Sequence, residues 1–360
     1  MNIMLFSRIL AKTGVGNYVK ILSEELVTQG HNVIVVSSTQ ELVLDSRVDF
    51  VHLPVASANP LQILKVVRTL HKIIKSRRIQ VVHCHHRKAA LIMALYNVFY
   101  RIPYVYTLHL ANIPSDFIHR KLTFVGERAI AISKEVRSSL INELDVPEDK
   151  VRDIPNGVRV VRNLTQTQII DQKALWNIPQ GKYVLTLHSR IDPVKNHLLM
   201  VEAIGKLSTE SKERIVVVCS GETSGGYYEQ VAARVSELGL QEQFRFVGWC
   251  DTVSVLGISD FLFLPSIKEG FGLTVAEAFL LRVPVARTKT AGFEEQRYCL
   301  PIDMYDPQPI VDIIEDLVEK GKDQYTQRIE DAYQLAMREF TLEIMTKRNI
   351  KVYEEVCSDA

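Results

Sequence analysis

The sequence predicts an α/β protein built from two parallel sheets in tandem, each covered by helices on both faces. Short apolar runs alternate with helical patterns along most of the 360 residues, as in sheets whose parallel strands are joined by helices. A chain of this length with 47% hydrophobic residues is also too large for one core. The alternation pauses in a polar stretch at residues 156–180, so we expect one domain over 1–160 and a second over 161–341.

The first half begins with a strand and alternates regularly from there. We expect strands at residues 2–6, 32–37, 49–53, 81–85, 104–108, 128–133 and 150–154. Helices are expected at 18–29, 61–75, 88–100 and from 134 to about 144. Because these strands are apolar throughout, the first domain is predicted to be Rossmann-like.

The second half repeats this order after the polar stretch. Strands are expected at residues 183–188, 214–220, 244–247, 260–264 and 283–287, and helices at 197–207, 227–238, 252–258 and 274–282. After Asp306 the pattern is helical to the end, with a last helix at 342–357. Ligands of such sheets bind at the carboxyl ends of the strands, so the loops there are the candidate sites.

The net charge of +1 conceals an uneven distribution. Residues 1–156 hold 20 Lys and Arg against 13 Asp and Glu, a balance of +7, which leaves −6 for the rest. The densest basic stretch, residues 64–78, shares a helical segment with apolar residues, and its cations are Lys65, Arg68, Lys72, Lys75, Arg77 and Arg78. Two interpretations stay open: the solvated face of a packed helix, or a surface that binds anionic lipid headgroups.

Several absences narrow the function classes. No apolar run reaches the ~18 residues of a membrane span, and residues 1–6 are too short and uncharged for a signal peptide. The five cysteines are scattered without a Cys-x-x-Cys pair, which indicates reduced thiols and argues against zinc. We therefore expect a cytoplasmic protein without a nucleic-acid partner, and peripheral contact with the inner face of an anionic membrane if the basic helix binds lipid.

A glycine loop follows the first strand at residues 13–17. Gly14 and Gly16 allow the backbone to approach an anion at the start of a helix. The loop is not the dinucleotide fingerprint, because Val19 holds the third glycine position and no acidic residue ends the second strand. A dehydrogenase is disfavoured on that ground, and a plain turn is the alternative interpretation of the loop.

Two cations lie in the loop that follows the strand at 183–188. Arg190 and Lys195 can reach one diphosphate together, Arg with its planar fork and Lys as a mobile point charge. Solvated loop cations are the alternative. The chain contains no Asp-x-Asp, which favours neutralisation of phosphate by these cations and by helix amides over a divalent metal.

Histidines end two strands of the first half. His109 follows the strand at 104–108, at the sheet edge where ligands bind, although a lone histidine is more often structural than catalytic. His83, His85 and His86 end the neighbouring run. A metal site there would need carboxylate partners, and the spacing supplies none.

Residues 265–284 combine a strand end, a glycine loop and the start of a helix, with Glu269 and Glu277 on either side of the turn. Unpaired amides at a helix start bind phosphate oxygens, and carboxylates accept hydrogen bonds from sugar hydroxyls. The loop therefore suits a ligand that is part anion and part sugar. A structural alternative is that Thr274 and Glu277 form a capping box.

This segment resembles the Glu-x7-Glu motif of glycosyltransferase family 4 (glycosyl transferases group 1), whose members are retaining enzymes with the GT-B fold. The glycine loop and the loop with Arg190 and Lys195 match the family in order and spacing, so the resemblance spans nearly all of the chain. It implies two Rossmann-like domains whose parallel sheets face a central cleft. The first domain would bind the acceptor and the second the donor, with the helix at 342–357 packed back on the first.

The resemblance also implies the reaction and its residues. The donor would be a nucleoside diphosphate sugar linked to UDP or GDP, and the acceptor a hydroxyl of a glycan or lipid-linked molecule in bacterial cell-envelope polysaccharide or lipopolysaccharide synthesis. A hexosyltransferase-type reaction of this kind needs no cofactor. The catalytic residues would be His109, Arg190, Lys195 and Glu269, and the donor-binding residues Gly14, Gly16, Arg190, Lys195, Gly270, Phe271, Gly272, Leu273, Thr274 and Glu277.

Within this set, the resemblance assigns Glu277 to the ribose, Glu269 to the donor sugar and the helix amides to the phosphates. Three positions depart from the family, which often has glycine where this chain has Thr13, Asn196 and Ala291. Two other classes stay open: a sugar-nucleotide epimerase or phosphorylase of the same fold, and a non-catalytic nucleotide-binding scaffold.

Overall fold

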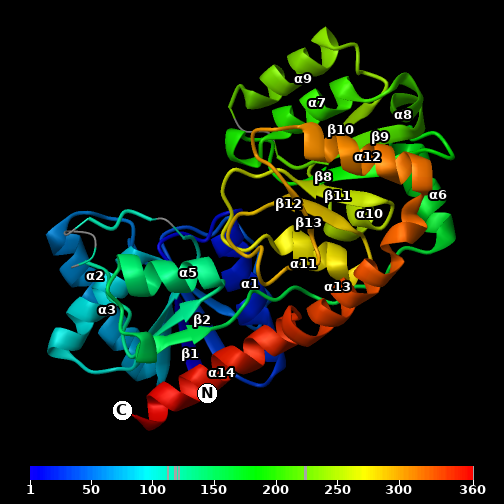
Figure 1. Cartoon of the computed structure of the whole chain (residues 1–360). Coiled ribbons are helices and arrows are strands. Elements are labelled where there is room, and N and C mark those ends of the chain that lie inside the picture. The colour runs from blue at the N-terminus through cyan, green and yellow to red at the C-terminus, as the bar shows by residue number, and fades with distance from the viewer. Residues whose placement is uncertain (112, 117–119, 121, 223–224, 360) are drawn as a thin grey trace. The chain divides into compact units, whose positions relative to one another are not determined.

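The chain forms two compact units in the computed structural model, which describes residues 1–360 except 112, 117–119, 121, 223–224 and 360 (Figure 1). The first unit comprises residues 1–158 and 339–360, and the second comprises residues 159–338. Each unit contains one parallel sheet flanked by helices, which confirms the predicted α/β class.

Seven parallel strands form the sheet of the first unit, in the order β3-β2-β1-β4-β5-β6-β7. They are β1 Asn2–Phe6, β2 Asn32–Ser37, β3 Asp49–His52, β4 Val81–Cys84, β5 Tyr104–Leu108, β6 Arg128–Ala131 and β7 Val151–Asp153. The described helices are α1 Gly14–Thr28, α2 Pro60–Ser76, α3 Arg87–Phe99, α5 Lys134–Ser138, a π-helical turn at Ser139–Glu143 and α14 Leu342–Ser358. Because β1 pairs with both β2 and β4, the strand order reverses between β1 and β4.

Local sequence sets the starts of the helices that follow β1 and β3. The Thr13 side chain accepts the N–H of Gly16 at the start of α1. The Asn59 side chain accepts the N–H of Leu61 at the start of α2, where Pro60 occupies the first helical position. Both arrangements satisfy amides that have no partner within the helix.

The C-terminal helix α14, red in Figure 1, packs against α1 and β4 of the first unit. The hydroxyl of its Tyr353 lies 2.6 Å from Nδ1 of His83, whose Nε2 lies 2.6 Å from Oγ1 of Thr107. Burial lowers the pKa of His83 to about 3. The neutral ring can donate from one nitrogen and accept at the other, so two hydroxyls satisfy it and tie α14 to the interior of the sheet.

Six parallel strands form the sheet of the second unit, in the order β10-β9-β8-β11-β12-β13. They are β8 Tyr183–His188, β9 Ile215–Ser220, β10 Phe244–Gly248, β11 Phe261–Leu264, β12 Val285–Thr288 and β13 Leu300–Ile302. The described helices are α6 Gln166–Leu175, α7 His197–Lys206, α8 Thr209–Arg214, α9 Tyr227–Glu237, α10 Thr252–Leu256, α11 Leu273–Leu280, α12 Gln308–Lys320 and α13 Thr326–Glu339. Here the strand order reverses between β8 and β11.

Three of these elements were not predicted from the sequence. Helix α6 lies in the polar stretch and buries none of its residues, so it has no apolar periodicity; a capping box of Thr165 and Gln168 marks its start. Helix α8 is six mostly polar residues long, and β13 has three residues with Pro301 in the middle. None of the three carries the apolar pattern on which the prediction depends.

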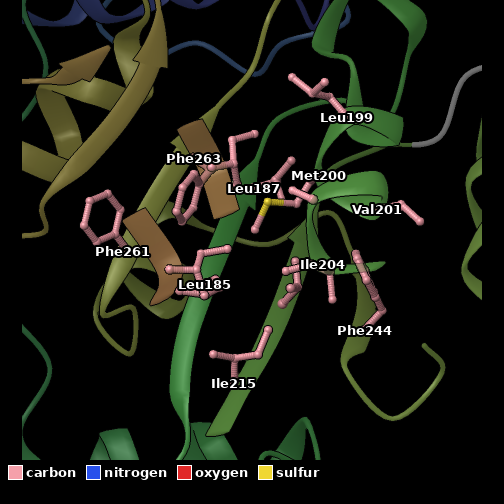
Figure 2. Close-up of a cluster of buried hydrophobic side chains, with 14 of the residues drawn as sticks. Leu185, Leu187, Leu199, Met200, Val201, Ile204, Ile215, Phe244, Phe261 and Phe263 are labelled. Carbon is pink, nitrogen blue, oxygen red and sulfur yellow. The ribbon is translucent and has the colours of Figure 1, made fainter. Parts of the chain in front are cut away.

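The two elements that flank the loop between β8 and α7 are both packed into the core of the second unit. Leu185 and Leu187 of β8 are fully buried in one cluster with Met200 and Ile204 of α7 (Figure 2). Phe263 of β11 belongs to the same cluster. The loops that leave β8 and β11 therefore start from packed, rigid strands.

The contact between α14 and the first sheet is testable by removing one hydroxyl. Tyr353→Phe leaves a buried nitrogen of His83 without its partner, so we expect a loss of about 1–2 kcal/mol in the free energy of unfolding, measured by urea denaturation. The control is Tyr305→Phe, because Tyr305 is 79% exposed. Equal urea midpoints for the two variants would contradict this role.

Candidate functional site

The two glycines of the loop after β1 differ in their surroundings. A Cβ added to Gly16 would lie 1.9 Å from the carbonyl oxygen of Ala11, whereas a Cβ added to Gly14 would meet nothing within 4 Å. Gly16 is therefore needed for packing at the start of α1. The backbone at Gly14 is open to the approach of a ligand.

His109 follows β5 and is enclosed by other rings of the first unit. Its Nε2 lies 3.3 Å from Nδ1 of His85, and its ring packs edge-on against Tyr18 at 4.8 Å. Burial, helped by the neighbouring His86 and His83, holds the pKa of His109 well below its usual range. His109 is therefore neutral at neutral pH and can form a hydrogen bond to a sugar hydroxyl, but it brings no positive charge to a phosphate.

The other strand-end histidines have structural partners. His86 Nδ1 lies 2.9 Å from the Ser7 hydroxyl, and His83 is held by α14 and β5 as described above. Among the residues that the structure describes, no group of three His, Cys, Asp or Glu side chains is arranged to hold a metal ion.

In the second unit, the predicted cations lie at the carboxyl end of β8, beside the point where the strand order reverses. Lys195 Nζ forms an ion pair with Oε1 of Glu269 at 2.5 Å, and both side chains are largely buried. Arg190 pairs with Asp192 at 3.0 Å, but its own side chain is 53% exposed. The structure thus brings Lys195 and Glu269 together and leaves the Arg190 guanidinium accessible to an anion.

The loop after β11 leads into α11 through Gly272, which has a φ of +84° and is the N-cap residue. The capping-box interpretation of Thr274 is wrong. Helix α11 begins at Leu273, so Thr274 lies inside the first turn, and its hydroxyl donates to the carbonyl oxygen of His188 at 3.3 Å. No side chain caps this helix, and its first amides have no partner within the helix, as an anion site requires.

Glu277 lies one turn further along α11 and is partly buried. Its carboxyl hydrogen-bonds the side chain of Thr252 at the start of α10, and burial raises its pKa to about 7. The Thr252 hydroxyl also lies 3.3 Å from Nε2 of His188. Glu277 is therefore held beside the ends of β8 and β10 and has an accessible proton near neutral pH.

Two buried residues that the sequence analysis did not single out lie behind this loop. Arg287 of β12 donates from Nη1 to the carbonyl oxygen of Phe271 at 3.0 Å, and Gln296 donates to that of Gly272 at 3.0 Å. Arg287 could have been singled out from the sequence, because it lies inside an apolar strand that should be buried on both faces. A charge buried in this way needs partners.

Known families match both units of the chain. Residues 12–162 match the family described as Glycosyltransferase Family 4, and residues 168–335 match the one described as Glycosyl transferases group 1. With two parallel sheets of the matching kind, the chain belongs to the family 4 glycosyltransferases of the GT-B fold. It is a glycosyltransferase.

Curated relatives agree with this class. An uncharacterised glycosyltransferase of Methanocaldococcus jannaschii is 24% identical in an alignment of 308 positions that covers 78% of each chain. The UDP-Gal:alpha-D-GlcNAc-diphosphoundecaprenol alpha-1,3-galactosyltransferase of Escherichia coli is 25% identical in an alignment of 232 positions that covers 60% of this chain and 59% of the relative.

Solved structures share the fold over the whole chain. A glycosyltransferase from Rickettsia africae has a TM-score of 0.89 at 23% identity and covers 100% of this chain and 99% of its own. The Anabaena protein HepE in complex with UDP and glucose has a TM-score of 0.84 at 17% identity, with 98% and 99% coverage. WaaG, a glycosyltransferase involved in lipopolysaccharide biosynthesis, has a TM-score of 0.75 at 12% identity, with 98% and 99% coverage.

The glycine loop yields a matched pair of variants. Gly16→Ala forces a Cβ against the backbone of Ala11, so we expect a lower melting temperature, by roughly 4 °C or more. Gly14→Ala adds a methyl group to open space and should leave the melting temperature within about 1 °C of wild type. Thermal unfolding measures the melting temperatures of both variants. A larger loss in Gly14→Ala than in Gly16→Ala would contradict this packing of the loop.

The ion pair of Lys195 and Glu269 is expected to contribute to stability. A double-mutant cycle with Lys195→Met and Glu269→Gln should give a coupling energy of about 1–3 kcal/mol by urea denaturation, because both side chains are largely buried. The exposed pair of Lys320 and Asp316 in the same unit is the control and should show no measurable coupling. Similar coupling at both pairs would argue against the partly buried setting.

Glu277 should make stability depend on pH. Its folded pKa of about 7 lies above the unfolded value of 4.5, so its contribution is fully present below pH 4.5 and is lost as the pH rises through about 7. Glu277→Gln lacks this dependence. Its melting temperature relative to wild type should therefore rise by roughly 2–4 °C between about pH 5 and pH 8. Parallel curves of melting temperature against pH for wild type and Glu277→Gln would refute the raised pKa. The control is Glu229→Gln, because Glu229 is exposed on α9.

Proposed function

We propose that the protein is a retaining glycosyltransferase that moves a sugar from a UDP- or GDP-linked donor to a hydroxyl of a glycan or lipid-linked acceptor. The observation that carries the proposal is the group of donors around the carboxyl ends of β8 and β11. Lys195, Arg190 and the uncapped start of α11 supply positive charge and amides, and Glu269 lies among them. The first unit binds the acceptor and the second binds the donor.

The donor diphosphate binds to the cations and to the amides of Gly272, Leu273 and Thr274. The exposed Arg190 fork meets one phosphate, and Lys195 leaves Glu269 to meet the other. Glu269, released from the ion pair, then accepts hydrogen bonds from hydroxyls of the donor sugar. In this way one binding event exchanges an internal ion pair for contacts with both ends of the ligand.

Glu277 and the residues around it bind the nucleoside. Its carboxylate accepts hydrogen bonds from the ribose hydroxyls, which favours the ionised form and lowers its pKa from about 7 when the donor binds. Gly270 and Phe271 directly precede the start of α11 in the chain and belong to the same proposed donor-binding loop.

The reaction breaks the bond between the sugar and the diphosphate while negative charge develops on the leaving group. Fixed cations and amides stabilise that charge and so lower the barrier. The acceptor hydroxyl attacks from the face that the diphosphate leaves, and the departing phosphate oxygen takes its proton. The neutral His109 of the first unit can form a hydrogen bond to a hydroxyl or phosphate oxygen without adding charge. No metal or cofactor takes part.

The choice of donor and acceptor draws on the comparisons. The Anabaena neighbour is a complex with UDP and glucose, and the Escherichia coli relative transfers galactose from UDP-Gal to a diphosphoundecaprenol-linked sugar. The WaaG neighbour is involved in lipopolysaccharide biosynthesis. We infer an acceptor of the bacterial cell envelope, either a polysaccharide or a lipopolysaccharide precursor.

A lipid-linked acceptor would bring the protein to the inner face of the membrane, and α2 has a suitable surface. Its cations Lys65, Arg68, Lys72 and Lys75 are all exposed. Leu61, 70% exposed, begins the same face of the helix. Cations with an apolar end are typical of helices that bind an anionic interface. No helix in the described part of the chain is long and apolar enough to cross a membrane.

The function is tested by incubating the protein with UDP- and GDP-sugars and a panel of glycan and lipid-linked acceptors. We expect transfer only when an acceptor is present, with the donor's anomeric configuration retained by NMR and no effect of EDTA. Lys195→Met should lower kcat by roughly 100-fold, and the exposed Lys206→Met should not. Donor turnover without an acceptor would indicate an epimerase, and nucleotide binding without any transfer a scaffold.

A covalent route through Glu269 is separable from direct attack. If Glu269 were the nucleophile, mass spectrometry of wild type with a slow donor would detect a glycosyl-enzyme, and Glu269→Gln would abolish transfer. We expect no such adduct.

Membrane binding is tested by sedimentation with liposomes that contain or lack anionic lipid. Wild type should sediment only with anionic liposomes, and the double variant Lys65→Gln/Lys72→Gln should not. The control is Lys347→Gln/Lys351→Gln, which removes two exposed charges from α14. Absence of wild-type binding at low salt would refute the contact.

A further inference from the structure

Arg287 lies in β12 with its whole side chain buried. A guanidinium is rarely buried completely, because its charge must be compensated by hydrogen bonds throughout. Its hydrogen-bond partners lie in two loops, the one that precedes α11 and the one that follows β12. The hydrogen bonds of the Arg287 guanidinium therefore show which parts of the unit this residue holds.

The fork of Arg287 connects two loops. On one side, Nη1 donates to the carbonyl oxygen of Phe271 at 3.0 Å, in the loop that precedes α11. On the other side, Nη2 donates to the carbonyl oxygen of Ala291 at 2.9 Å and to the Thr290 hydroxyl at 3.0 Å, in the loop that follows β12. Nη1 also donates to Oε1 of Gln296.

Gln296 closes the arrangement. Its side-chain amide is fully buried and donates from Nε2 to the carbonyl oxygen of Gly272 at 3.0 Å. A Cβ added to Gly272 would lie 3.1 Å from Nη1 of Arg287, so the backbone there touches the guanidinium. Arg287 and Gln296 thus hold two successive carbonyls, those of Phe271 and Gly272.

The direction of these carbonyls decides where the neighbouring amides point. In a planar trans peptide, the C=O and the N–H point in opposite directions. The carbonyl of Phe271 shares its peptide with the N–H of Gly272, and the carbonyl of Gly272 shares its peptide with the N–H of Leu273. Because both carbonyls are drawn toward Arg287 and Gln296, both N–H groups face away from them. A hydrogen bond from a cation to the carbonyl also polarises the peptide and makes the N–H opposite a stronger donor.

We propose that Arg287, together with Gln296, is the positioning residue that aims the amides of Gly272 and Leu273 at the donor diphosphate. The inference rests on the proposed function, because it needs the start of α11 to be the phosphate site. Arg287 does not touch the ligand in this account. Its planar fork is essential, since a lysine at this position would supply the charge but could not hold both loops at once.

The test is the binding of nucleoside diphosphates to Arg287→Lys. We expect calorimetry with UDP and GDP to show roughly tenfold weaker binding of the diphosphate that wild type prefers, and unchanged binding of the matching nucleoside. The control is Arg282→Lys, a partly exposed arginine of the same unit that pairs with Glu330. Wild-type diphosphate affinity in Arg287→Lys, or equal losses for diphosphate and nucleoside, would overturn the proposal.

Gln296→Met provides a second test that keeps the buried arginine. It removes the bond to the Gly272 carbonyl and the side-chain oxygen that accepts from Arg287, but it keeps the bond of Arg287 to the Phe271 carbonyl, so we expect roughly threefold weaker diphosphate binding. Hydrogen exchange by mass spectrometry should be faster in a peptide covering 270–281 and unchanged in β8 and β9. If Arg287→Lys does not fold, this variant decides: wild-type affinity and exchange in Gln296→Met would overturn the proposal.

The same measurements separate this inference from the proposed function. If wild type binds neither UDP nor GDP, the proposed function fails together with the inference. If wild type binds and Lys195→Met weakens binding while Arg287→Lys does not, only the positioning role of Arg287 is wrong.

Discussion

The reversal of strand order beside the first strand of each sheet is the constraint on which both candidate sites depend. In the second unit it lies between β8 and β11, and right-handed connections carry the helices after these strands to opposite faces. Both loops leave the sheet at its carboxyl edge, where ligands of such sheets bind. Lys195 from one loop and Glu269 from the other meet there at 2.5 Å.

The proposed donor site combines mobile charge with fixed backbone. Arg190, half exposed, and Lys195, paired with Glu269, can rearrange when an anion arrives. The amides at the start of α11 cannot, because buried side chains hold the carbonyls behind them. Such preorganised donors stabilise developing charge without the cost of reorientation during the reaction. Mobile charge and fixed backbone need different arginines. The proposed site therefore contains an exposed arginine, Arg190, and a buried one, Arg287.

The sequence was sufficient for the sheets, because they depend on local patterns, and it singled out the candidate residues Lys195 and Glu269, which the structure brings together. Apolar strands and long amphipathic helices were predicted, whereas α6, without a buried face, was not. Arg190, Lys195 and Glu269 were found from their place after strands. The alternative interpretation of Thr274 as a helix cap is wrong because a left-handed Gly272 takes the N-cap, and backbone angles are not visible in a sequence. Arg287 was missed because its partners come from two separate loops.

We propose that the second unit binds the donor diphosphate between its cations and the start of α11. The most direct measurement is a crystal structure of the protein with an uncleavable UDP-sugar or GDP-sugar analogue. We expect the phosphates to contact Lys195, Arg190 and the amides of Gly272 and Leu273, with the ion pair of Lys195 and Glu269 broken. A nucleotide bound elsewhere, or phosphates held while that ion pair stays intact, would contradict it.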